Sequence, residues 1–223
     1  MKIATFAFIA VSAIMSFSGN AKADYNVWTE AKTRLTLSFP DTWKQINNDL
    51  PIDLITLSIP SGDDKAVCRV RVEEDRRFMI YPNRYRKDIR DQFFTNDYWV
   101  KTLTAYNNVN LIKYEDNAGL GQGFASMALV SYLTVPSAAD GSDVSDRGGI
   151  MAVTNYGDKV YLVECSAYLP SYSNYHVQFM DFFKSITFKK AYHELAVGDY
   201  RNFINDWGTV NVAFPNAVSR STY

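Results

Sequence analysis

Three glycines at alternate positions, Gly119, Gly121 and Gly123, form the stretch that comes nearest to a phosphate-binding loop. A dinucleotide-binding loop has the spacing G-x-G-x-x-G between a strand and a helix, so that helix amides meet the phosphates. Here Phe124 interrupts that spacing, and residues 125–133 alternate as a strand does. The Gly-Lys-Ser/Thr of a P-loop is absent as well. We therefore expect a glycine bend that leads into a strand.

Histidine chemistry is the second candidate. His193-Glu194 begins like the zinc motif H-E-x-x-H, but Val197 stands where the second histidine should be. His176 is the only other histidine, and two imidazoles fall short of the usual zinc site. No G-x-S-x-G motif supplies a nucleophilic serine. We expect no catalysis, no metal site and no cofactor.

An acidic segment could suggest calcium. Asp140, Asp143 and Asp146 recur at every third position. A calcium loop of the EF-hand type instead needs oxygen ligands at alternate positions and a closing glutamate. This spacing favours a solvated loop between strands.

The first 23 residues have the pattern of a secretory signal. Lys2 precedes the apolar run 3–17, and Ala21-Lys22-Ala23 ends it with small residues around a cleavage site. We expect cleavage after Ala23, a mature chain that begins at Asp24, and a periplasmic or secreted location. The run is shorter than the roughly 20 residues that span a bilayer, so no membrane span is expected in the mature chain.

Composition excludes some classes of partner. Without Lys2 and Lys22 the chain has 21 basic and 24 acidic residues, which gives a formal charge of −3. Such a balance provides no overall attraction for nucleic acid. The remaining 200 residues suit one domain with a full core.

The pattern of apolar residues along the chain predicts mainly strands, with two helical segments. We expect a helix over 84–94 followed by a further turn that carries Trp99, and a second amphipathic helix in which aromatic residues recur from Tyr175 to Ile186. The remaining periodic segments alternate as strands, with an antiparallel meander in the second half: 35–39, 54–59, 66–73, 109–114, 124–135, 149–155 and 159–168. This order predicts an α+β fold.

The two cysteines, Cys68 and Cys165, are expected to form a disulfide. Export brings the chain into a compartment where thiols are oxidised. Cys68 alternates with Val70 and Cys165 with Val163, so both point toward apolar core. Two separate buried thiols are the alternative. The opposite face of residues 66–73 is expected to face water.

Two segments are candidates for binding a partner. Six basic residues, interleaved with aromatic ones, could meet an acidic partner or lipid headgroups, although a solvated helix face is the alternative: Arg76, Arg77, Arg84, Arg86, Lys87 and Arg90. Near the C-terminus, Asp199 can cap a helix with an apolar stripe that includes Tyr200, Phe203 and Trp207, and residues 209–214 then alternate like a strand. This unit either packs on its own domain or docks on a partner.

Several short motifs together resemble the PsbP-like superfamily. They are the strand and turn Leu37-Ser38-Phe39-Pro40-Asp41-Thr42-Trp43, the glycines 119–123, the strand Val160-Tyr161-Leu162-Val163, and the closing helix and strand 182–188. The superfamily includes photosystem extrinsic subunits, envelope proteins of the DcrB and LpqN types, and a Ran-binding nuclear import factor. The resemblance implies an αβα sandwich with an antiparallel sheet over residues 24–189. Residues 190–223 form an extension beyond the usual closing strand.

The expected function is therefore binding in the cell envelope, as an accessory protein whose protein partner is unknown. Fold alone does not assign that partner. A small hydrolase, or a ligand-binding protein that uses a cleft among the aromatic residues, is the alternative.

Overall fold

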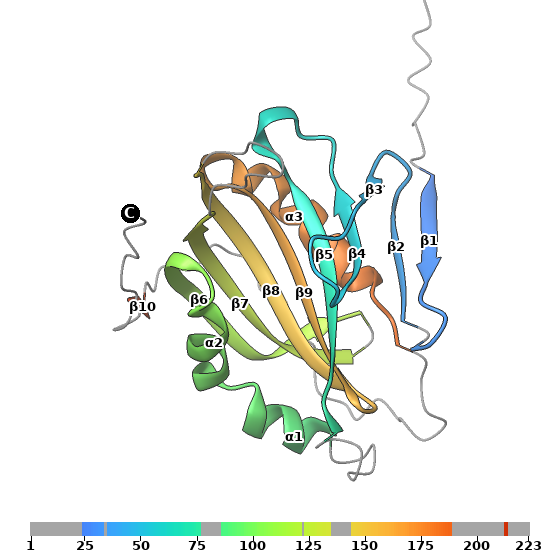
Figure 1. The fold of residues 1–223 in the computed structure, drawn as a ribbon, viewed down its shortest axis with the longest axis vertical. Helices are drawn as coiled ribbons and strands as arrows, with labels where there is room; N and C mark the ends of the chain where they lie inside the picture. Colours follow the sequence, from blue (N-terminus) through green and yellow to red (C-terminus); the bar gives the residue numbers. More distant parts are fainter. Residues whose placement is uncertain are drawn as a thin grey trace, which may run out of the picture.

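The structure is a computed structural model, and it describes residues 24–33, 35–76, 86–121, 123–134, 144–188 and 212–213. At positions 86, 87, 117, 212 and 213 only the backbone is described. The elements follow in chain order (Figure 1): β1 (Tyr25–Thr29), β2 (Thr36–Pro40), β3 (Lys44–Ile46), β4 (Asp53–Ser58), η1 (Gly62–Asp64), β5 (Val67–Glu74), α1 (Arg86–Phe93), α2 (Asn96–Leu103), β6 (Asn107–Leu120), β7 (Gly123–Leu133), β8 (Asp146–Tyr156), β9 (Lys159–Tyr168), η4 (Leu169–Ser171), α3 (Tyr172–Ser185) and β10 (Val212–Ala213).

The strands form one large antiparallel sheet and one separate hairpin. The large sheet has the order β10-β6-β7-β8-β9-β5-β4-β3, and β1 pairs only with β2. The meander from β6 to β9 is the one expected from the sequence. Of the C-terminal segment, Val212 and Ala213 pair with Leu111 and Asn110 of β6.

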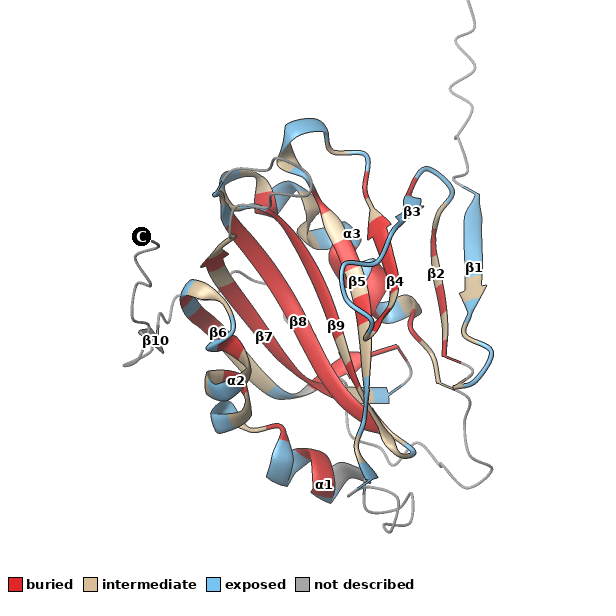
Figure 2. Cartoon of the chain, in the orientation of Figure 1, coloured by how far each residue is buried: buried red, intermediate tan, exposed pale blue. Residues whose placement is uncertain are grey.

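Helices cover both faces of the large sheet (Figure 1). α3 packs on one face, in a cluster that also contains the hairpin residues Leu37 and Phe39. On the other face, α2 contributes Trp99 and Leu103 to a second cluster with β7 and β8. Strands β7, β8 and β9 are accordingly buried along most of their length (Figure 2). The α+β architecture with helices on both sides of an antiparallel sheet is confirmed.

Two strands were not expected from the sequence, and one is longer than expected. β1 and β3 are mostly exposed, so neither shows the alternation by which a half-buried strand is recognised. β6 extends to Leu120, beyond the expected end at Tyr114. Irregularities in its pairing with β7, including one between Glu115 and Ala118, interrupt the apolar pattern there.

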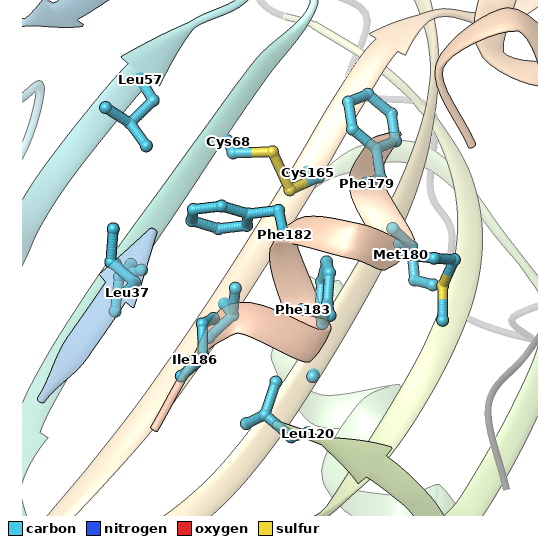
Figure 3. Packing of buried hydrophobic residues seen from close by; sticks show 14 of the residues in the cluster. Leu37, Leu57, Cys68, Leu120, Cys165, Phe179, Met180, Phe182, Phe183 and Ile186 are labelled. Atoms are coloured by element: carbon cyan, nitrogen blue, oxygen red, sulfur yellow. A yellow bond between two sulfur atoms is a disulfide. The ribbon is translucent and has the colours of Figure 1, made fainter. Parts of the chain in front are cut away.

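The expected disulfide is present. Cys68 of β5 and Cys165 of β9 stand directly opposite each other in the strand register, with their α-carbons 4.0 Å apart. The bridge lies in the core beneath α3, next to Phe182 (Figure 3). It therefore joins two strands that are 97 residues apart in the chain.

This burial predicts how the bridge reacts. Both cysteines are fully buried, so reductant should leave the folded protein oxidised and act only once denaturant opens the core. Thiol counting in denaturant without reductant should find no reactive thiol. Reduction should lower the free energy of unfolding by about 4 to 5 kcal/mol, because it frees a long loop in the unfolded chain. Two reactive thiols before reduction would contradict the bridge.

The glycine motif forms the turn between β6 and β7, as expected, and it contacts α3. The Gly121 N–H donates to the carbonyl of Phe183 at 2.9 Å, and this carbonyl near the end of the helix also accepts from the Ile186 N–H at 3.4 Å. Gly121 has a φ of +54°, and a Cβ placed on it would lie 1.5 Å from the Ile186 carbonyl oxygen. Glycine is therefore required by both conformation and contact.

Gly121→Ala should destabilise the protein more than Gly157→Ala does. Gly157 also has a positive φ, but a Cβ there would meet nothing within 4 Å. Gly157→Ala should cost about 1 to 2 kcal/mol for the left-handed conformation alone. Gly121→Ala should cost at least about 2 kcal/mol more, because the end of α3 must move. If urea unfolding shows the same loss of unfolding free energy in both variants, the close contact between the turn and the end of α3 is contradicted.

Candidate functional site

A hollow of about 320 Å³ lies between the β1–β2 hairpin and α3. Its apolar lining comes from Tyr25, Pro40, Trp43 and Phe182. The rings of Trp43 and Phe182 pack against each other with centroids 5.7 Å apart, and both are almost fully buried. Tyr25 is 61% exposed and stands at the opening. The volume is at the lower end of the range for small-ligand pockets and also suits a single large side chain.

The polar groups around the hollow are mostly engaged with one another. The Lys184 ammonium contacts the Asp181 carboxylate at 3.1 Å. The Ser185 hydroxyl donates to the carbonyl of Phe182 at 2.7 Å and accepts from the Ser38 N–H at 3.2 Å. No histidine is among the described lining residues. This arrangement is suited to holding an apolar group.

A buried carboxylate lies on the opposite face of the sheet. Glu164 of β9 accepts hydrogen bonds from the hydroxyls of Tyr132 at 2.8 Å and Tyr106 at 3.1 Å. The Arg71 guanidinium lies 3.4 Å from the same carboxylate and also donates to Asp53 at 3.0 Å. These side chains come from β4, β5, β7, β9 and the connection between α2 and β6.

The charges of this cluster stabilise one another. Burial alone would raise the pKa of Glu164, but the charges of Arg69 and Arg71, with hydrogen bonds from Tyr132 and Tyr106, lower it below its ordinary value of 4.5. Burial, together with the nearby charge of Glu164, raises the pKa of both phenols, which therefore remain donors.

This cluster corrects the expectation that Arg69 and Arg71 face water. Arg69 is directly opposite Glu164 in the strand register, and the Arg71 side chain is only 14% exposed. The alternation of apolar and polar residues along residues 66–73 identified the face that carries Arg69 and Arg71. It could not show that a carboxylate on β9, almost a hundred residues away, would meet them there.

Of the six basic residues singled out in the sequence, only Arg76 and Arg90 have described side chains, so the predicted cluster stays a prediction. Arg76 is exposed just after β5, Arg86 begins α1, and Arg77 and Arg84 lie outside the described residues. Arg90 is buried, with its guanidinium over the ring of Phe124 at 5.4 Å, so it is not part of a solvated helix face. Tyr200, Phe203 and Trp207, from the expected C-terminal helix, also lie outside the described residues.

Of the candidate metal ligands, the structure describes only His176 and Asp146. His176 is half-buried on α3, where its Nδ1 lies 3.0 Å from the Tyr172 hydroxyl. His193, Asp140 and Asp143 lie outside the described residues, and Asp146 begins β8. Within the described ranges no three potential ligands come together. The helices described there are all too short or too polar to cross a membrane.

Sequence reasoning missed the hollow because its parts are distant in the chain. Trp43 and Phe182 both lie in motifs that resemble PsbP-like proteins, but nothing local shows that they are in contact. Tyr25 belongs to a strand that was not recognised. The only available signal was the excess of aromatic residues, which suggested a cleft without placing it.

Comparison with known proteins gives similarity in fold only. No protein-family model and no curated protein matches the chain. Among solved structures, it is similar to cyanobacterial PsbP from Synechocystis, with a TM-score of 0.46 and 14% identity over 79% of this chain and 99% of that one.

Two other solved structures are similar to a comparable extent. The Ran-binding protein Mog1p of Saccharomyces cerevisiae has a TM-score of 0.44 and 8% identity over 74% of this chain and 95% of its own. LpqN of Mycobacterium tuberculosis, described as involved in cell envelope biogenesis, has a TM-score of 0.40 and 12% identity over 75% and 91%. PsbP-like proteins, which the sequence resembles, are thus among its structural neighbours. At these values the likeness carries no argument about activity or partner.

Replacing Glu164 with Gln should lower the free energy of unfolding at pH 7 by about 2 kcal/mol, because the buried Arg71 loses one of its two carboxylate partners and keeps Asp53. The loss should diminish in acid. The folded-state pKa of Glu164 lies below 4.5, so its stabilisation is complete above that pH and disappears as the pH falls through the lowered pKa.

Urea unfolding from pH 7 to about pH 3 measures this difference. Glu74→Gln is the control, because Glu74 contacts Lys159 at 3.4 Å while its side chain is 67% exposed, and it should change stability little. A difference between wild type and Glu164→Gln that stays constant with pH would contradict the assignment.

Proposed function

We propose that this chain is an exported, non-catalytic binding protein that holds a protein partner in the cell envelope at the hollow beside α3. The observation that carries the proposal is the hollow itself. Its floor is aromatic, most of its polar groups are engaged with one another, and the exposed Tyr25 stands at its opening. An aromatic anchor in a desolvated pocket is the usual energetic centre of a protein interface.

Export is supported by two features of the chain. The signal pattern over residues 1–23 predicts cleavage before Asp24, and the Cys68–Cys165 bridge is of a kind that persists in oxidising compartments. The intact mass of protein recovered from its native compartment should begin at Asp24.

Binding of the partner should depend on access to the hollow. Gln178 is exposed on α3 and lines the hollow, so Gln178→Arg places a charge in an apolar site without removing core. Cross-linked capture from native envelope extract should yield a stoichiometric protein with the wild type. The Gln178→Arg variant should retain about a tenth of it or less.

Ser173→Arg is the matched control, because it adds the same charge to an exposed position of α3 that does not line the hollow. It should capture as much partner as the wild type, and both variants should keep the wild-type Tm. Equal capture by Gln178→Arg and wild type would overturn the site. A small molecule that co-purifies in place of a protein would favour the alternative of a ligand-binding protein.

A further inference from the structure

We propose that the outer edge of β1 binds an extended, uncharged segment of the partner protein, which adds to the β1–β2 hairpin as a third strand. The inference rests on the proposed function and adds the chemistry of the partner. β1 is the outermost strand of its sheet and has no other strand beside it in the described part of the chain (Figure 1).

The strand register shows which backbone groups of β1 are unsatisfied. The Asp41 N–H donates to the Asp24 carbonyl, and the Glu30 N–H donates to the Leu35 carbonyl. In an antiparallel pair, hydrogen-bonded residues alternate with residues whose backbone groups point away from the partner strand. Residues 24, 26, 28 and 30 therefore bond to β2. The N–H and C=O groups of Tyr25, Val27 and Thr29 point outward.

On the opposite edge of the hairpin, the outward backbone groups of β2 do have hydrogen-bond partners. The residues of β2 that face Tyr25, Val27 and Thr29 are Pro40, Ser38 and Thr36. Thr36 exchanges two backbone hydrogen bonds with Thr187, the Ser38 N–H donates to Ser185, and Pro40 has no N–H. The outer edge of β2 is thus covered, whereas no equivalent covers β1 in the described part of the chain.

The side chains of β1 also lack the features that protect an exposed edge. Edge strands are usually short, charged, bulged or interrupted by proline. β1 reads Tyr-Asn-Val-Trp-Thr, without charge or proline, and Tyr25 and Val27 are 61% and 69% exposed. By contrast, the edge strands of the large sheet are very short: β3 has three residues and begins with Lys44, and β10 has two.

Charge and area indicate an extended peptide segment as the occupant. β1 itself has no charged side chain, and Asp24 and Glu30 lie just beyond its two ends. The two charges in the hollow, Asp181 and Lys184, contact each other, so an uncharged segment is the complement of the strand. A stable dimer needs about 800 Å² from each copy, which one five-residue strand falls short of providing. Addition of a peptide strand needs less buried area, because main-chain hydrogen bonds supply affinity and alternate side chains supply specificity. Those side chains would lie against Tyr25 and Val27.

Val27→Pro tests the edge directly. It removes an outward N–H while leaving the β1–β2 ladder intact, so the Tm should stay within a few degrees of the wild type. Val27→Thr keeps the N–H and a β-branched side chain and is the matched control. Asn26→Pro removes an inward N–H and should lower the Tm clearly.

The probe is a displayed library of random ten-residue peptides, selected on the wild-type protein. Enriched peptides should be uncharged with alternating apolar residues, and they should bind Val27→Pro about tenfold more weakly than wild type or Val27→Thr, as loss of an edge hydrogen bond and a steric block would require. Equal binding to Val27→Pro, enrichment no greater than on an unrelated protein, or a large loss of Tm in Val27→Pro would each overturn the inference.

The outcomes separate this inference from the proposed function. Peptides that lose binding to Gln178→Arg but not to Val27→Pro would leave the hollow as the site and exclude the edge. Failure to capture an envelope partner would count against the proposed function, while peptide binding sensitive to Val27→Pro would still sustain the edge. A concentration-dependent dimer that Val27→Pro abolishes would identify a second copy as the occupant and overturn the choice of a peptide.

Discussion

The pairing of β5 with β9 is the junction on which the structure depends. It joins the β3–β4–β5 unit from the first half of the chain to the meander from the second half. On the face beneath α3 the two strands are linked by the disulfide between Cys68 and Cys165. On the other face Arg69 stands opposite Glu164, and Arg71 contacts the same carboxylate. A covalent bond and a buried ionic cluster therefore hold one pair of strands from opposite sides.

This junction also positions the candidate site. α3 begins shortly after β9 and packs on the face that contains the disulfide, so its register on the sheet is fixed near its start. Its C-terminal end is held by the β6–β7 turn through Gly121 and by the pairing of Thr36 with Thr187. The hairpin is attached through the pairing of β2 with Thr187 and through Trp28 of β1, which packs against the core. That attachment creates the hollow on the α3 side and leaves β1 uncovered on the other.

Some elements were predictable because their signal is local. The alternation around Cys68 and Cys165 identified the core face of two strands, and the spacing of aromatic residues from Tyr175 to Ile186 identified α3. The sequence was least informative where the environment of a strand is uniform. β1 is exposed on most of its residues and β3 on all three, so neither shows a contrast between faces.

The α+β class, the core face of each half-buried strand and the glycine turn were predictable from the sequence, because each follows from the chemistry of neighbouring residues. The adjacency of the strands, by contrast, is established only in the folded chain. Contact between Trp43 and Phe182, and between Arg71 and Glu164, depends on that adjacency. Local periodicity places a side chain on a face, but the free energy that brings distant segments together comes from burying many such faces at once.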